Sequence, residues 1–150
     1  LSAEAGFSGG RYHHLSASVL EEAWMDALSV HRRRPFLFLA EGVFMYFEAA
    51  QVKALVLALR DHFPGAELVF DGWKPFQIWI GRLVLGDLLR WGFWRGQDLE
   101  GWGGGIRLLD AWGYFDRPEP RLRPFRWMAP VFRLLKPMRV FHFRLGEAAG

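Results

Sequence analysis

The chain has 150 residues, enough for one domain with a core, and 51% of them are hydrophobic, which excludes a disordered chain. It has no cysteine, so disulfides and thiolate metal sites are excluded. The net charge is +3, and the basic residues are 16 Arg and three Lys, a ratio typical of a GC-rich bacterial genome. Only residues 31–34 form a basic run, so nucleic acid is not an expected partner.

The first predicted elements are a short strand over residues 14–17 and a helix that begins at Ser18. Ser18 and Glu21 have the spacing of a capping box, which marks the start of a helix. The apolar side chains expected on one face of this helix are those of Leu20, Trp24 and Leu28. His13 and His14 lack metal-ligand spacing relative to the nearby acids, so no metal is expected.

An unbroken apolar run, from Phe36 to Ala40, is too short for a helix and is typical of a parallel strand buried on both faces. The run ends on a carboxylate, Glu41, which is followed by Gly42. Ligands of open α/β sheets bind at the carboxyl ends of the strands, whereas an acid inside a buried strand would be an unpaired charge. Glu41 is therefore the leading candidate for a ligand-binding side chain.

Residues 48–63 have the clearest helical periodicity in the chain, and Pro64 and Gly65 end the pattern. A second short strand, 67–71, follows and again ends in an acid, Asp71, before a glycine. Strand, helix and strand in this order predict a right-handed crossover between parallel strands and hence an α/β fold. We interpret Asp71 as a cap for the turn that follows it.

Residues 73–112 are predicted to be a helical, aromatic-rich insertion resembling a lid. Its aromatic side chains either line a pocket for a flat apolar acceptor or simply pack in the core. Three charges interrupt its hydrophobic stretch, so no membrane contact is predicted; no N-terminal leader pattern is visible and a cytoplasmic location is expected. Within it, residues 96–105 read as a Gly-rich loop and residues 106–112 as a helix.

The rest of the chain is predicted to hold a short strand at 114–115, an irregular Pro-rich link and a final strand over 138–145. His142 lies inside that final strand and is interpreted as a hydrogen-bonded core residue rather than a base.

The segment Ala-Glu-Gly-Val-Phe-Met-Tyr-Phe at 40–47 resembles the signature of the leucine carboxyl methyltransferase family, specifically its tetracenomycin-type polyketide O-methyltransferase branch. Segments 16–26, 62–71 and 140–146 resemble other parts of that family in the same order. The resemblance implies a Rossmann-like class I methyltransferase fold, with a mostly parallel sheet and an antiparallel last strand, and S-adenosylmethionine as cofactor.

In that fold 36–41 would be the fourth strand, 67–71 the fifth and 138–145 the last. The Gly-rich turn after the first strand and the acid after the second have no counterpart here. The resemblance therefore implies that residues 1–150 are a partial domain, the C-terminal half, whose partner is the missing N-terminal half and which is inactive alone.

The resemblance also implies site residues. Glu41, with Gly42, would contact the amino-acid end of the cofactor, because a carboxylate pairs well with an ammonium group. Ser18 and Val19 fall on the positions that hold the adenine, although a helix cap explains Ser18 equally well. Tyr46 falls on a tyrosine that faces the substrate, or is a core tyrosine.

Trp73 and Trp79 are predicted to contact the acceptor, a small apolar, polyketide-like molecule methylated on a carboxylate or hydroxyl. Two alternatives remain: a non-catalytic module that binds a partner or membrane through its aromatic face, and an inactive gene fragment.

Overall fold

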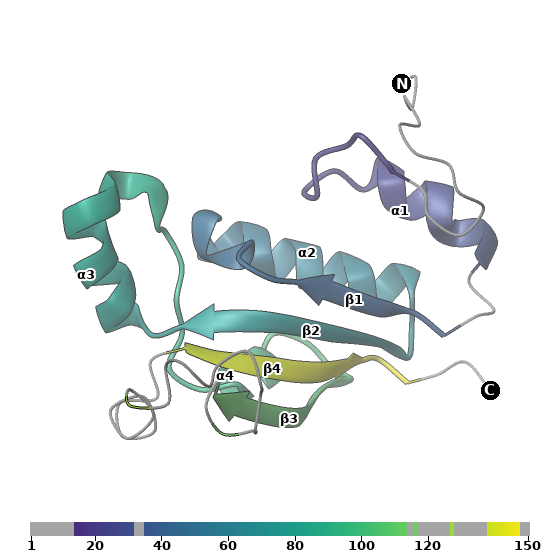
Figure 1. Ribbon diagram of the computed structural model, residues 1–150. Helices are drawn as coiled ribbons and strands as arrows, with labels where there is room; N and C mark the ends of the chain where they lie inside the picture. The colour runs from purple at the N-terminus through teal and green to yellow at the C-terminus, as the bar shows by residue number, and fades with distance from the viewer. Residues whose placement is uncertain (1–13, 32–34, 114–115, 117–126, 128–137, 148–150) are drawn as a thin grey trace.

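The computed structural model describes residues 14–31, 35–113, 116, 127 and 138–147, which form a four-stranded mixed sheet with the long helix α2 packed on one face (Figure 1). The helices are α1 (Ala23–Leu28), α2 (Ala49–His62), α3 (Pro75–Leu85) and α4 (Gln97–Glu100), with 3-10 turns η1 (Ser29–His31), η2 (Phe44–Tyr46) and η3 (Gly86–Leu88). The strands are β1 (Leu37–Ala40), β2 (Ala66–Trp73), β3 (Ile106–Gly113) and β4 (Met138–Leu145).

The strand order in the sheet is β1-β2-β4-β3. β1 and β2 are parallel and are joined by α2, while β4 is antiparallel to both of its neighbours. The βαβ crossover, the α/β class and the antiparallel last strand predicted from the sequence are therefore confirmed. Two strands that are distant in sequence, β2 and β4, make the longest pairing, from Ala66 opposite Leu145 to Trp73 opposite Met138.

Helix α2 begins and ends where its sequence predicts. At its start the side-chain Oε1 of Gln51 accepts a hydrogen bond from the Glu48 N–H at 2.9 Å, which satisfies a donor that the helix itself cannot pair. At its end the chain turns through Gly65, whose φ of 84° suits glycine. The buried side chains lie three and four residues apart and face the sheet: Val52, Leu55, Val56 and Leu59.

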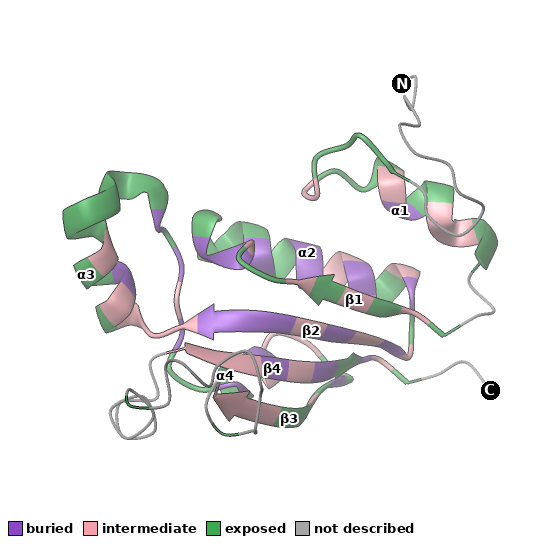
Figure 2. Ribbon diagram, viewed as in Figure 1, coloured by how far each residue is buried: buried purple, intermediate pink, exposed green. Residues whose placement is uncertain are grey.

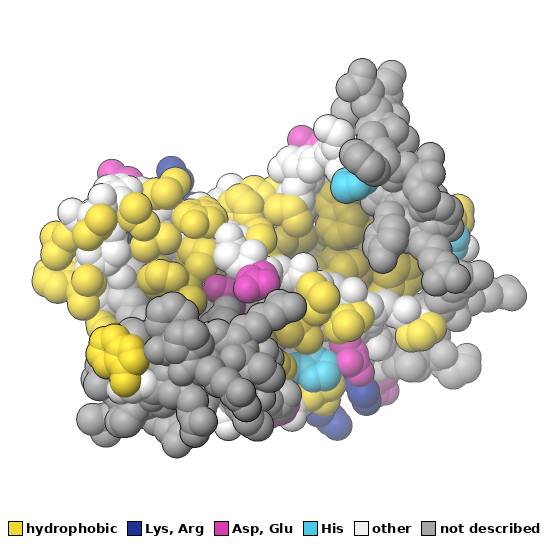
Figure 3. Space-filling view, in the orientation of Figure 1, with side chains coloured by type: hydrophobic (Ala, Val, Ile, Leu, Met, Phe, Trp, Pro, Cys, Tyr) yellow, Lys and Arg dark blue, Asp and Glu magenta, His cyan; other side chains and the backbone are white. Residues whose placement is uncertain are grey.

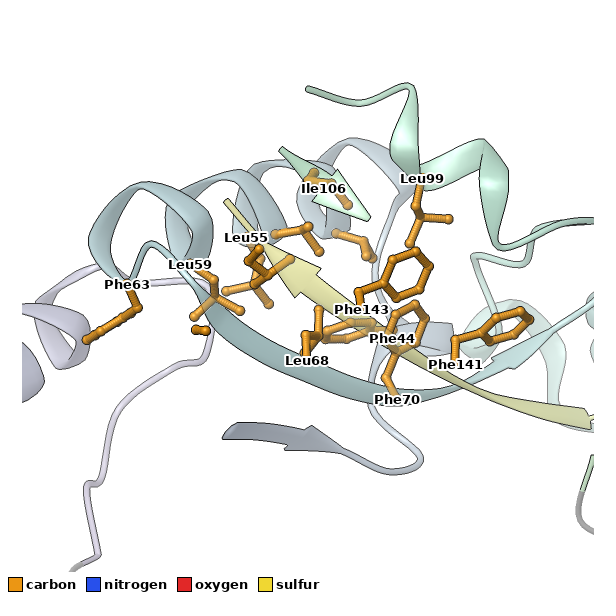
Figure 4. Packing of buried hydrophobic residues seen from close by; sticks show 14 of the residues in the cluster. Phe44, Leu55, Leu59, Phe63, Leu68, Phe70, Leu99, Ile106, Phe141 and Phe143 are labelled. Carbon is orange, nitrogen blue, oxygen red and sulfur yellow. The ribbon is translucent and has the colours of Figure 1, made fainter. Parts of the chain in front are cut away.

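The core between α2 and the sheet contains a cluster of packed aromatic rings (Figure 4). Phe70 on β2 is at its centre: its ring stacks on Phe143 of β4 at 5.7 Å and lies 4.9 Å from the ring of Phe44 in η2. Trp91 and Phe93 pack on the same ring from the segment after η3. Since burying one such side chain contributes about 1.5–3 kcal/mol, this cluster fixes η2 and residues 91–93 onto the sheet.

The prediction that the 36–40 run is buried on both faces is wrong. β1 lies at the edge of the described sheet, and its side chains alternate between exposed and half-buried (Figure 2). Leu37 is 57% exposed and Leu39 71% exposed, whereas Phe38 packs against the core. The face of β1 that points away from α2 has no covering layer among the described residues.

The predicted start of the first helix is also wrong. Residues 14–17 form no strand, and the helix begins at Ala23 rather than at Ser18. The Ser18 hydroxyl instead accepts a hydrogen bond from the Leu20 N–H at 3.3 Å, within the preceding turn. Leu20, Trp24 and Leu28 all pack against the core as expected, but Leu20 lies in the turn before the helix and not on its face.

The third correction concerns residues 106–112, predicted as a helix but found as strand β3. Apolar residues there recur at spacings that fit both a helix and a strand, and the pairing with β4 makes the segment a strand. A register shift between Leu108 and Asp110 is the signature of a β-bulge. The Gly-rich loop at 96–105 contains the short helix α4. The strand predicted at 114–115 lies outside the described residues.

Among the described residues, helix α3 carries the largest group of exposed apolar side chains. Figure 3 shows hydrophobic side chains gathered over the end of the molecule where α3 lies. The large exposed side chains of this helix are Phe76, Trp79, Ile80, Leu83, Val84 and Leu85. Among the residues that the structure describes, no helix is both long and apolar enough to cross a membrane.

Candidate functional site

The carboxyl ends of the parallel strands β1 and β2 bring two acids together. Ala40 and Phe70 are paired in the parallel register, so the residues that follow them, Glu41 and Asp71, come at the same end of two neighbouring strands. Glu41 leaves the sheet immediately after β1, whereas Asp71 is still within β2. This edge of the sheet is where open α/β folds bind ligands.

Asp71 holds the bend that follows β1. Its Oδ1 accepts a hydrogen bond from the Gly42 N–H at 2.7 Å, and the residue is only 5% exposed. Gly42 has a φ of 64°, a left-handed conformation that glycine adopts without steric cost. The prediction that Asp71 caps the turn after it is therefore wrong, because the carboxylate caps the bend at the end of the neighbouring strand.

Next to this bend a cavity of about 220 Å³ opens on the face of the sheet that α2 does not cover. Figure 3 shows acidic side chains among hydrophobic groups on this face. Its lining is apolar apart from the two carboxylates: Leu39, Ala40, Glu41, Val69, Phe70, Asp71 and Val140. The alternation of β-strand side chains puts Leu39, Val69 and Val140 on the face opposite the aromatic core.

No cation neutralises the two acids within the part of the chain that the structure describes. Glu41 is exposed and makes no hydrogen bond or ion pair with a described residue. Asp71 accepts a hydrogen bond from the Gly42 N–H, and no described Lys, Arg or His side chain forms an ion pair with Asp71. An apolar cavity with two uncompensated carboxylates at one end favours a ligand that carries a positive charge there.

Ser18 and Val19 are not among the residues that line this cavity. Ser18 is exposed, while Val19 is half-buried against the core and its carbonyl accepts the indole N–H of Trp24 at 3.2 Å. They lie in the turn that leads into α1. The described structure thus brings Glu41 and Gly42 into one site and leaves the other predicted cofactor pair outside it.

The three residues predicted to contact an acceptor lie beyond the cavity as well. Tyr46 belongs to η2 and is partly exposed, and Trp79 is 66% exposed on α3. Trp73 ends β2 and packs on a small second core made of Met45, Ile78 and Leu89. Its indole Nε1 is buried and has no hydrogen-bond acceptor among the described residues, so this donor is unsatisfied.

The sequence interpretation missed the role of Asp71 in this site, although a signal was present. Both parallel strands end in an acid followed by glycine, at Glu41-Gly42 and at Asp71-Gly72. Adjacent parallel strands align their carboxyl ends, so the repeat predicts that the two acids meet. The bend at Gly42 decides that Asp71 accepts a backbone hydrogen bond and that Glu41 accepts none from a described residue.

A second polar cluster, on the same uncovered face, lies farther from the carboxyl end of β2. The His142 Nε2 lies 2.7 Å from Oε2 of Glu67, and Arg144 approaches the other carboxylate oxygen at 3.4 Å. The hydrogen bond from His142 lowers the pKa of Glu67 below its ordinary value, and Arg144 adds to the effect. His142 is thus hydrogen-bonded, as predicted, but it is half-buried on this face rather than in the core. The described residues hold no group of three or more potential metal ligands, and His13 lies outside them.

The chain is 28% identical over 138 residues to the tetracenomycin polyketide synthesis O-methyltransferase TcmP of Streptomyces glaucescens. That similarity covers 87% of this chain and 50% of TcmP, so the chain spans about half the length of this curated relative. No model of a known protein family matches the chain.

Among solved structures, an O-methyltransferase family protein from Burkholderia thailandensis matches with a TM-score of 0.50 and 10% identity, over 94% of this chain and 38% of that one. The N-methyltransferase NodS from Bradyrhizobium japonicum WM9 matches with a TM-score of 0.41 and 12% identity, over 76% of this chain and 53% of that one. The fold is a methyltransferase fold. The expected α/β class is thereby confirmed, and the cavity lies at the carboxyl edge of its parallel strands.

Proposed function

We propose that this chain is the C-terminal half of an S-adenosylmethionine-dependent O-methyltransferase of the leucine carboxyl methyltransferase family, in its tetracenomycin-type branch. The observation that carries the proposal is the Glu41 carboxylate, which has no partner among the described residues and lies at the end of β1 beside an apolar cavity. Sequence similarity to TcmP, whose name describes an O-methyltransferase of polyketide synthesis, supports the same reaction class.

The residues of the cavity fit one end of this cofactor. S-adenosylmethionine supplies an electrophilic methyl group on a positively charged sulfur. Its amino-acid end carries an ammonium group, for which Glu41 is a suitable acceptor because charge-assisted hydrogen bonds are strong in a dry pocket. At about 220 Å³ the cavity is smaller than the roughly 300–1,000 Å³ typical of sites for whole ligands. It would therefore hold the amino-acid end, and Ser18 and Val19 would approach the adenine from elsewhere.

The acceptor is proposed to be a small apolar molecule with a carboxylate or hydroxyl to be methylated. Tyr46 and Trp79 offer exposed aromatic surface next to this end of the sheet. The buried indole N–H of Trp73 has no hydrogen-bond partner among the described residues. An oxygen of the methyl-acceptor molecule would accept a hydrogen bond from this indole N–H. These residues would align the acceptor and exclude water, which is the main contribution that a transferase of this kind makes.

We further propose that the rest of the enzyme covers the uncovered face of the sheet and pairs with β1. Leu37 and Leu39 of the edge strand β1 are 57% and 71% exposed, which is unfavourable unless another layer covers them. The intact mass of the native gene product tests this directly. A product about twice as long agrees with the proposal, whereas a native product of 17.4 kDa contradicts it.

The cofactor assignment is tested by calorimetric titration of the complete gene product with S-adenosylhomocysteine. We expect micromolar-range binding that Glu41→Gln weakens about tenfold or more, since a hydrogen bond to a charged group contributes about 1.5–3 kcal/mol. The matched control is Glu147→Gln, which removes the same charge from an exposed site after β4, at the opposite end of the sheet. Equal affinities of wild type and Glu41→Gln would refute the assignment of Glu41.

The exposed apolar side chains of α3 favour a second candidate function, a non-catalytic module that binds a membrane surface or a partner through this helix. Flotation of the protein with phosphatidylcholine and phosphatidylglycerol vesicles separates the two. Vesicle binding that Trp79→Ala abolishes, without any binding of S-adenosylhomocysteine, would favour the second candidate. Cofactor binding without flotation would favour the enzyme.

A further inference from the structure

We propose that Asp71 is a positioning residue for the cofactor: it fixes the Glu41–Gly42 bend and so holds the Glu41 carboxylate at the end of the cavity. The inference rests on the proposed function, because Glu41 is the residue expected to bind the cofactor's ammonium group.

A hydrogen bond to the neighbouring strand sets the geometry of the bend. The hydrogen bond from the Gly42 N–H to Asp71 Oδ1 is 2.7 Å long and joins residues 29 positions apart in the chain. It fixes the backbone at the residue directly after Glu41. Since Gly42 has a φ of 64° and a Cβ at this position would meet nothing within 4 Å, packing around the side-chain position does not hold the bend. The Asp71 hydrogen bond does.

Asp71 is buried. A carboxylate that is 5% exposed is costly to keep unless it is hydrogen-bonded, and its described partner is a backbone N–H rather than a cation. Asp71 also lines the cavity beside Glu41. Val69 and Val140, which lie on the same face of the sheet, are apolar, whereas Asp71 is the one polar or charged residue that is buried among the described residues. At Asp71 the chain keeps an acceptor that reaches across to β1.

The test uses the complete gene product with two substitutions at one position. Asp71→Ala removes the acceptor, and we expect the affinity for S-adenosylhomocysteine to fall about tenfold. Asp71→Asn keeps an oxygen for the Gly42 N–H, and we expect it to stay within about threefold of wild type. Asp61→Asn, on the exposed side of α2, controls for the loss of one negative charge. If Asp71→Asn weakens binding as much as Asp71→Ala, charge rather than positioning is responsible, and the inference fails.

A double-mutant cycle separates positioning from a general structural role. If Asp71 acts through Glu41, Asp71→Ala in a Glu41→Gln background should weaken binding by no more than about twofold further. A further tenfold loss in that background would mean that the two residues act independently, which would overturn the inference.

The amide of Gly42 supplies a readout that does not depend on the cofactor. In the nitrogen-15 spectrum of the unliganded protein, we expect the Gly42 amide proton to move upfield and to exchange faster in Asp71→Ala but not in Asp71→Asn. An unchanged Gly42 amide in Asp71→Ala would overturn the inference even if that variant binds the cofactor more weakly. A wild-type protein that binds no S-adenosylhomocysteine would overturn the proposed function instead.

Discussion

At the scale of single residues, Gly42 shows how one backbone conformation shapes the candidate site. Its φ of 64° is costly for most residues, yet open space surrounds the position where a side chain would begin. A substitution there is therefore limited by backbone conformation and not by crowding. Asn adopts the left-handed conformation more readily than other non-glycine residues, because its short polar side chain can hydrogen-bond locally.

We expect Gly42→Ala to lower the free energy of unfolding by about 1–2 kcal/mol and Gly42→Asn to cost clearly less. Urea denaturation of the variants measures both. Gly104 is the matched control, since a Cβ there also meets nothing within 4 Å and its φ is not positive. Gly104→Ala should be neutral or stabilising by about 0.4–1 kcal/mol. Equal effects at the two positions would contradict the assigned conformation of Gly42.

The Glu67 carboxylate makes stability depend on pH. Its pKa is lowered in the folded chain, first by the hydrogen bond from His142 and then by Arg144. A lowered pKa stabilises the fold fully above the ordinary Glu pKa of about 4.3, and this contribution is lost as pH falls through the lower folded value. Urea midpoints of wild type and Glu67→Gln should therefore differ at pH 6 and converge towards pH 3. Constant separation across that range would contradict the pairing.

At the scale of elements, the aromatic core decides how the pieces after β2 return to the sheet. Phe70 is buried beneath rings from η2, from residues 91–93 and from β4. The Met45 carbonyl of η2 accepts backbone N–H groups of Arg90 and Trp91 at 2.7 and 3.2 Å, which fastens the same two segments together. Ring packing on Phe70 and hydrogen bonds to the Met45 carbonyl thus both hold η2 and residues 90–93 at the carboxyl edge of the sheet.

Phe70→Ala should cost about 3–5 kcal/mol of stability, because it leaves a cavity among rings that cannot all close in. The comparison is Leu83→Ala on α3, an exposed side chain whose loss should change stability by no more than about 0.5 kcal/mol. Thermal and urea denaturation of both variants provide the test. A small effect at Phe70 would mean that the cluster is not the main core.

At the scale of the whole molecule, the uncovered sheet face predicts a difference between this chain and a longer product. In the 150-residue chain Leu39→Ala should cost less than about 0.5 kcal/mol, because Leu39 is 71% exposed. In a complete enzyme that covers this face it should cost about 2–5 kcal/mol. Leu68→Ala, in the core of β2, should be costly in both. If Leu39→Ala lowers stability by the same small amount in both proteins, the proposal that another layer covers this face is refuted.

Local patterns in the sequence determined the central part of this fold. The helical period of 49–62, the two short apolar strands around it and the acid-glycine pairs that end those strands are properties of neighbouring residues. They were sufficient for the βαβ unit, its parallel pairing and the choice of Glu41 as a ligand-binding candidate. The final strand was predictable for the same reason, since its run of β-branched and aromatic residues is short and bounded.

The tertiary structure alone decided what depends on partners distant in sequence. Residues 106–113 have a pattern that fits helix and strand, and their pairing with β4 at Ile106–Leu145 makes them a strand. Phe36–Ala40 has the composition of a central strand, yet its exposure follows from its place at the edge of the described sheet. The bond between Asp71 and Gly42 spans 29 positions. Neighbouring residues fix local conformation, but burial, strand pairing and caps between strands depend on which distant segments the packed core brings together.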